Sequence, residues 1–294
     1  MIGQGAQIGS GAGPTNIILP GLYLLFDRGG RPTRSEVSGL LPSLSRAAIS
    51  HDPAQRAGGA SSQLHGGNRA RISVTADGRR PSRGNAERYD ARRDAWLELL
   101  VDGLTFDLLG LAPGPALDTP AISHLFSVPT DLDLGAMDAI GLFPGPHLCG
   151  GANSLPVVRT MLALASDMAE ALGAVRAVVW SPASSAIAPA FFRKIVASWL
   201  RGGPFPAMGV VSYAVDGEGG LQSEGLAFFN GQELALSPAL SDDRIAATRL
   251  AARLVHELVA SGAITEDTVF ATEDGGQIML SPDTAGRTIR VTGM

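Results

Sequence analysis

The sequence predicts an α+β fold with an α/β-like middle: a mixed β-sheet with flanking helices, followed by C-terminal hairpins. Two observations support this class. Between residues 147 and 215, short apolar runs alternate with long helical patterns, as in strands joined by crossover helices. After residue 216, turn signals such as Asn230-Gly231 separate short alternating segments, which is typical of hairpins.

Composition divides the chain into three regions. Residues 1–14 are rich in glycine and predict a flexible tail, since no strand precedes them to support a dinucleotide-binding turn. Residues 52–93 carry nine arginines against four acids and almost no large apolar side chains, so burial cannot offset their ordering entropy. We expect this Arg-rich segment to be a disordered insertion. Residues 15–51 and 94–294 are then expected to form one α+β domain.

The first ordered region predicts a strand and a helix. The run "IILPGLYLLF", residues 17–26, is short and apolar throughout, which is typical of a strand buried on both faces. Residues 33–49 follow with a helical pattern that Thr33 or Ser35 can cap. Pro42 must kink or interrupt this helix, because its ring blocks a backbone hydrogen bond.

A hairpin is predicted where the chain resumes after the Arg-rich segment. Asp102-Gly103 separates two alternating runs, and both positions of a two-residue hairpin turn need positive φ. The alternation places Glu98 and Asp107 on the solvent face.

The rest of the chain alternates between regular elements and loops. Residues 112–143 predict an irregular connection with one short helix near 134–140. The expected elements after it are a strand at 147–153, a helix at 155–173, a strand at 174–180, a helix at 187–203, a strand at 208–215, a hairpin at 226–237, a helix at 241–262 and strands within 268–282 and 287–293. Ser241 is expected to cap the last helix, with Asp242 and Asp243 in its first turn, where the helix dipole favours negative charge.

Charge and cysteine content limit the compartment and the partners. The single cysteine, Cys149, cannot form an intramolecular disulfide, and the run 17–26 lacks the basic flank of a signal peptide. No window approaches the roughly 18 apolar residues of a membrane span. We therefore expect a cytoplasmic protein without a membrane partner. The net charge of −5 argues against nucleic acid as a partner, except through the Arg-rich 52–93 segment.

The C-terminal half resembles a bacterial family, the domain of unknown function 4261. The resemblance rests on "GPHLCGGANSL", on "GAVRAVVWSPASSAIAPAFF" and most of all on "SEGLAFFNGQELALSP". The residues of the last stretch that match the family pattern are Gly225, Leu226, Phe229, Gly231, Glu233 and Leu234. The resemblance as a whole extends from about Asp94 to the C-terminus. The resemblance implies a fold and a bacterial cytoplasmic setting, but no activity.

Three kinds of catalytic or metal site find little support. His147 and Cys149 share a face of the expected strand, but no third group completes a cysteine nucleophile, so Cys149 is interpreted as core packing. The five histidines are scattered, and neither HExxH nor a paired CxxC occurs, so no metal or cofactor is predicted. The carboxylate pairs Asp131/Asp133 and Glu224/Glu233 are interpreted as solvated side chains.

One anion site remains as a hypothesis. If the strands at 147–153 and 174–180 are parallel, the turns "GGANSLP" and "SPASSAIAP" emerge at one sheet edge, and each opens a helix with free N–H groups. A carboxylate or phosphate would then lie among the polar residues Asn153, Ser154, Ser181, Ser184 and Ser185. Ordinary helix capping explains the same residues.

The leading interpretation is a non-catalytic protein-binding or accessory module, with an immunity or adaptor role as one form. It depends on the lack of a recognisable catalytic set and on the long loops and basic segment open to a protein partner. The alternative is an enzyme or sensor that binds a small anionic ligand near Asn153 and Ser184. The sequence does not indicate an oligomeric state.

Overall fold

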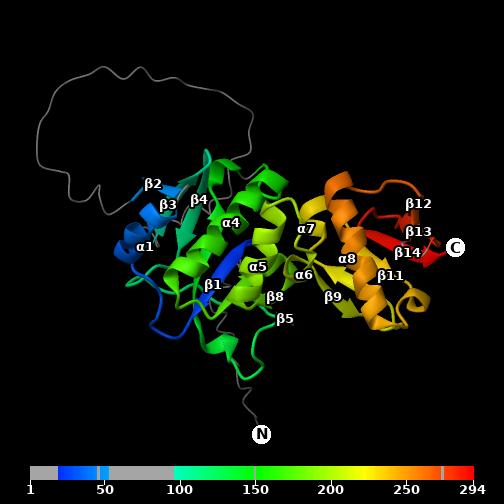
Figure 1. Cartoon of the computed structure of the whole chain (residues 1–294), viewed down its shortest axis with the longest axis horizontal. Helices are drawn as coiled ribbons and strands as arrows, with labels where there is room; N and C mark the ends of the chain where they lie inside the picture. Colours follow the sequence, from blue (N-terminus) through cyan, green and yellow to red (C-terminus); the bar gives the residue numbers. More distant parts are fainter. Residues whose placement is uncertain (1–18, 45–46, 53–95, 149, 273–274) are drawn as a thin grey trace, which may run out of the picture.

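The computed structural model describes residues 19–44, 47–52, 96–148, 150–272 and 275–294. Within them the chain forms two mixed β-sheets with helices packed against them, which confirms the α+β class but replaces the single expected sheet by two. In Figure 1 the first sheet, coloured blue to green, lies on the left and the second, yellow to red, on the right. The tail predicted at 1–14, nearly all of the Arg-rich segment and Cys149 lie outside the described residues.

The first sheet has eight strands in the order β2-β3-β4-β6-β1-β7-β8-β5. They are β1 (Leu22–Phe26), β2 (Ala47–His51), β3 (Trp96–Val101), β4 (Leu104–Leu109), β5 (His124–Phe126), β6 (Asp138–Pro144), β7 (Ala177–Trp180) and β8 (Ser185–Ile187). Every neighbouring pair is antiparallel except β5 and β8, which are parallel.

Both faces of the first sheet are covered near its centre, as predicted for the strand that became β1. Leu22 and Leu24 of β1 belong to a cluster that includes α4 (Leu155–Leu172) and α5 (Pro189–Leu200), and these helices lie over one face in Figure 1. Tyr23 and Leu25 point the other way, into a second cluster with side chains of the irregular segment 112–137. A strand with two covered faces needs apolar residues at consecutive positions.

The second sheet has six strands in the order β12-β13-β14-β11-β10-β9. They are β9 (Ser212–Val215), β10 (Leu221–Glu224), β11 (Glu233–Leu236), β12 (Thr268–Ala271), β13 (Gln277–Pro282) and β14 (Thr288–Gly293). Only β11 and β14 are parallel neighbours. The long helix α8 (Arg244–Ser261) contacts β10 and β11, and its buried face includes Ala247, Ala251 and Leu254. These side chains continue the cluster that begins under α4.

Several local predictions are confirmed. Asp102 and Gly103 form the turn between β3 and β4 with φ of 50° and 82°. Helix α1 (Arg34–Leu40) begins at Thr33, whose side chain forms a capping box with Glu36. The predicted extent of this helix is wrong, because it ends before Pro42 and residues 47–49 belong to β2. Gly173, with φ of 63°, ends α4. None of the helices in the described ranges is long and apolar enough to cross a membrane.

The strand predicted at 147–153 is wrong, and so is most of the helix predicted near 134–140. Residues Pro146–Leu148 form a 3₁₀ turn, and β6 is the strand that precedes α4. Of the predicted helix, only Leu134–Ala136 forms a 3₁₀ turn. Pro144 and Pro146 lack N–H groups, so they end the strand. Strands β6 and β7 do run in the same direction, but β1 lies between them and pairs antiparallel with both.

Three further predictions are wrong. Asp107 is 1% exposed, because it shares its face of β4 with Leu109, which is covered by the second cluster. Asp243, not Ser241, caps α8 by accepting hydrogen bonds from the N–H groups of the first turn. The residues expected as the first strand of the 226–237 hairpin form the short helix α7 (Ala227–Asn230), and β11 pairs with β10 instead. The remaining short helix, α6 (Ala207–Val210), precedes β9.

Candidate functional site

The predicted serines gather in the turn between β7 and β8, where the two sheets meet. Ser181 accepts a hydrogen bond from the Gly21 N–H at 2.9 Å, and its single hydroxyl proton is within reach of the carbonyl oxygens of Leu19 and Gly21, just before β1. Ser185 is fully buried and donates to the carbonyl oxygen of Gly209. Both hydroxyls are therefore engaged in internal bonds that hold this turn.

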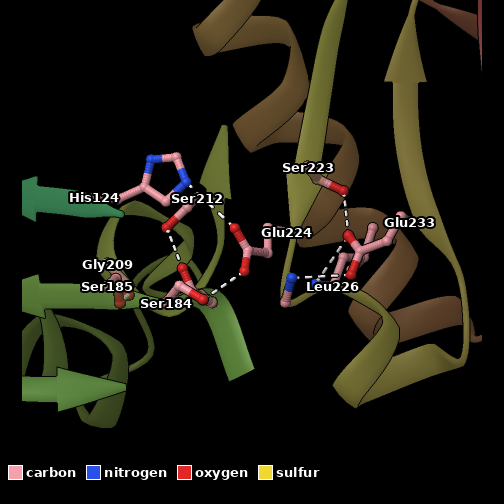
Figure 2. A network of polar contacts seen from close by, with 11 residues as sticks. His124, Ser184, Ser185, Gly209, Ser212, Ser223, Glu224, Leu226 and Glu233 are labelled. Atoms are coloured by element: carbon pink, nitrogen blue, oxygen red, sulfur yellow. Dashed lines mark hydrogen bonds and ion pairs between the residues drawn. The ribbon is translucent and has the colours of Figure 1, made fainter. Parts of the chain in front are cut away.

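Ser184 lies at the centre of a polar contact between the sheets (Figure 2). Its backbone adopts the left-handed conformation, with φ of 44° and ψ of 38°, which is uncommon outside glycine. Its Oγ donates to Oε1 of Glu224 on β10 at 2.6 Å, and the other oxygen of Glu224 lies 3.3 Å from Nε2 of His124 on β5. The carboxylate thus joins three segments that are distant in the sequence.

This arrangement differs from a serine hydrolase triad. In a triad the imidazole lies between the hydroxyl and the carboxylate, so that it can take the proton of the nucleophile. Here the carboxylate of Glu224 lies between Ser184 and His124. The N–H groups of Ser123 and His124 both point to the carbonyl oxygen of Ser184, so they are not available to a developing oxyanion. The contact therefore joins β5, β10 and the turn before β8, and it lacks the geometry of a triad.

Glu233 forms a second, separate network. Its carboxylate accepts the Ser223 hydroxyl at 2.5 Å and backbone N–H groups of residues 225–227 at 2.9 to 3.3 Å. Ser223 and Glu224 are consecutive in β10 and so point to opposite faces of the strand. Glu224 and Glu233 therefore do not act as a pair. Tyr213, beside Ser223 in the ladder, has a raised pKa because its hydroxyl is buried and Glu233 is negatively charged.

The residues that carry the family resemblance have structural roles at this junction. Gly225 has φ of 100°, and an added Cβ would lie 2.7 Å from the Cβ of Ala183. Gly231 ends α7 in the left-handed conformation. Leu226 and Leu234 are buried, and the ring of Phe229 packs against Trp180, Phe205 and Phe228.

The structure shows no direct bond between the two halves of the hypothetical anion site within the described residues. Asn153 and Ser154 are exposed at the start of α4, and Ser154 is its N-cap residue without a side-chain capping bond. Within the described ranges, no hydrogen bond joins either residue to the three serines. The serine turn leads into β8, and α5 begins only after Ala188, so this turn does not open a helix as expected.

His147 lies outside the junction. It is exposed, and its Nε2 is 2.7 Å from the Thr105 hydroxyl. The hypothesis that His147 acts together with Cys149 involves Cys149, which lies outside the described residues. In that part, no group of three or more His, Cys, Asp or Glu side chains is arranged to hold a metal ion.

Sequence reasoning missed an open groove beside β5, which we call the β5 groove. Its volume is about 740 Å³. The residues lining it are Ala116, Leu117, Asp118, Thr119, Pro120, Ile122, Ser123, Leu125, Leu132, Asp133, Leu134, Gly135, Met137 and Asp138. One signal was visible in the sequence: residues 112–138 contain four aspartates and no lysine or arginine. An acidic surface was therefore predictable, although its shape was not.

Comparisons with known proteins found no match. The chain matches no protein-family model, no curated protein and no solved structure. Function must therefore be inferred from the geometry of the chain.

Proposed function

We propose that this chain is a non-catalytic protein-binding or accessory module of the bacterial cytoplasm, and that it binds its partner at the β5 groove. The bacterial setting, and membership of the domain of unknown function 4261 family, rest on the pattern from Gly225 to Leu234 and belong to the proposal. The observation that carries the binding role is the position of Leu125. This leucine is 48% exposed on an edge strand and lines a groove large enough for several side chains.

The bonding of the polar residues supports a module without catalysis. The hydroxyls of Ser181, Ser184 and Ser185 donate to groups of the chain itself. Glu233 accepts four hydrogen bonds from its own surroundings. Nucleophiles and bases that serve a reaction must be able to exchange such partners for a substrate.

The alternative function, binding of a small anion near Asn153 and Ser184, has less support. The side chains of three of its five residues already make internal hydrogen bonds. Inorganic phosphate would have to raise the melting temperature of the wild type, and substitution of both Asn153 and Ser184 by alanine would have to abolish that effect.

Co-purification tests the protein-binding role. The tagged chain is recovered from the organism that encodes it as wild type, as Leu125→Ser and as Val215→Ser. Val215 is a matched control, because it is 56% exposed and lies on the edge strand of the other sheet. We expect one stoichiometric protein with the wild type and with Val215→Ser, and a clearly lower recovery of it with Leu125→Ser. Equal recovery with all three chains, or no partner with any, would contradict the proposal.

A further inference from the structure

We propose that the β5 groove takes an extended segment of a partner protein that carries basic side chains, and that this segment pairs with β5 as an added strand. This inference rests on the proposed function, since it names the chemistry of the partner at the same surface.

The outer side of β5 is open to strand addition. The N–H of His124 and the carbonyl oxygen of Phe126 both bond toward the β8 side, to Ser184 and Ala188. Because successive residues of a strand direct their backbone groups to opposite sides, the N–H and C=O of Leu125 point away from β8. Within the described residues, no strand lies on that side. An extended peptide can therefore bond to Leu125 through its own backbone.

The groove lies where alternate side chains of such a peptide would point. Ser123 and Leu125, two apart in the chain, both line it, whereas His124 points elsewhere and contacts Glu224. Side chains of an added strand alternate in the same way as those of β5, so every second one faces the groove. The apolar part of the lining, which includes Ile122 and Met137, can pack against the aliphatic stem of an arginine side chain that faces the groove.

The charge of the groove selects a basic partner. Three aspartates line it: Asp118 and Asp133 are exposed, and Asp138 is paired with Arg31. None of the described lining residues is a lysine or arginine. A concave surface with charge of one sign attracts segments of the opposite sign and repels those of its own. Arginine side chains of the partner would lie near Asp118 and Asp133.

Binding of three fluorescent heptapeptides, measured by anisotropy on the full chain, tests the inference. The peptides alternate valine with arginine, with glutamine or with glutamate. We expect the arginine peptide to bind about five to ten times more tightly than the glutamine peptide, a preference that falls with added salt, and the glutamate peptide to bind most weakly. Equal affinity for all three peptides would overturn the inference that the partner segment carries basic side chains.

Variants of the groove test the two parts of the inference separately: the preference for basic side chains and the addition of a strand to β5. Asp118→Asn combined with Asp133→Asn should remove most of the preference for arginine over glutamine, while Asp131→Asn should not. Asp131 is the matched control, because it is exposed in the same segment but does not line the groove. Leu125→Pro should abolish binding of every peptide without disturbing the ladder, since the lost N–H points outward. Leu125→Ser, which keeps that N–H, should retain part of the affinity.

Three other outcomes decide between this inference and the proposed function. If no peptide binds but a partner co-purifies in a Leu125-dependent manner, the strand-addition inference is wrong and the protein-binding role stands. If light scattering shows self-association that Leu125→Pro abolishes, the occupant is a second copy of the chain, and the basic-partner inference is wrong. If neither peptides nor a partner bind, both proposals are wrong.

Discussion

The carboxylate of Glu224 on β10 lies 3.3 Å from the Nε2 atom of His124 on β5, so a side-chain contact links the edge strand of the first sheet to the second sheet. Ser184 donates to the same carboxylate from the turn between β7 and β8. The contact therefore lies next to the edge on which we place the binding surface, and its strength decides how firmly β5 is held.

Replacement of Glu224 by glutamine tests that strength. The Glu224 side chain is 44% exposed, so water screens its attraction to His124, and the amide oxygen of the introduced glutamine could still accept the Ser184 hydroxyl. We expect Glu224→Gln to lower the free energy of unfolding by less than about 1 kcal/mol. Urea unfolding measures this change. A loss of more than about 2 kcal/mol would show a strong, buried contact instead.

Replacement of Glu233 by glutamine should be more damaging. Its carboxylate accepts three backbone N–H groups and the Ser223 hydroxyl, and the amide NH₂ of glutamine would face donors where an acceptor is needed. We expect a loss of about 2 to 4 kcal/mol in the free energy of unfolding. Glu224→Gln is the matched control, because it makes the same chemical change on the other network. Equal losses for the two variants would refute this ranking.

The glycine at the junction offers a second contrast. Gly225 has φ of 100°, and a Cβ there would lie 2.7 Å from that of Ala183, whereas Gly231 has φ of 85° and open space around it. Gly225→Ala combines backbone strain with a clash, so we expect a loss of about 2 to 4 kcal/mol. Gly231→Ala carries the strain alone and should cost about 1 kcal/mol. Thermal and urea unfolding of the two variants would contradict this account if Gly231→Ala were the less stable.

Local sequence signals predicted the elements whose cause is local. The apolar run of β1, the Asp102-Gly103 turn and the glycine after α4 each act within a few residues, and each prediction is confirmed. Strand β6 was not predicted, because Gly141 interrupts its apolar pattern. Part of the reason for that glycine is tertiary: an added Cβ would lie 2.7 Å from the side chain of Leu117, which belongs to the irregular segment on this face of the sheet.

The candidate site could not be predicted from the sequence, because its contacts join residues that are distant in the chain. Strand β8 has only three residues, and its partners β5 and β7 are known only once the sheet is formed. Ser184 was identified as polar and close to a turn, but its acceptor, Glu224, is 40 residues away in the chain. Sequence alternation also placed Asp107 in solvent, since it cannot report that an irregular segment covers the second face of the sheet.

Asp138 provides a prediction for the dependence of stability on pH. The Gly29 N–H donates to its carboxylate at 2.9 Å, and the Arg31 side chain lies 3.3 Å away, so the pKa of Asp138 is lowered from its ordinary value of 3.8. The unfolded chain then binds a proton more readily than the folded one, and stability must rise with pH. The contribution of Asp138 is fully present above pH 3.8 and is lost as the pH falls through the lower folded value.

Asp138→Asn should therefore unfold more easily than the wild type at neutral pH, by about 1 kcal/mol because part of the pair is solvated. As the pH falls below 3.8 the two chains should converge, and they should become equal once the folded wild-type carboxyl is protonated as well. Asp131→Asn is the control, because this exposed aspartate lies in the same segment and should give a curve parallel to that of the wild type. A stability difference for Asp138→Asn that stays constant from neutral pH to acid would show that the charge of Asp138 does not hold Gly29 and Arg31 in place.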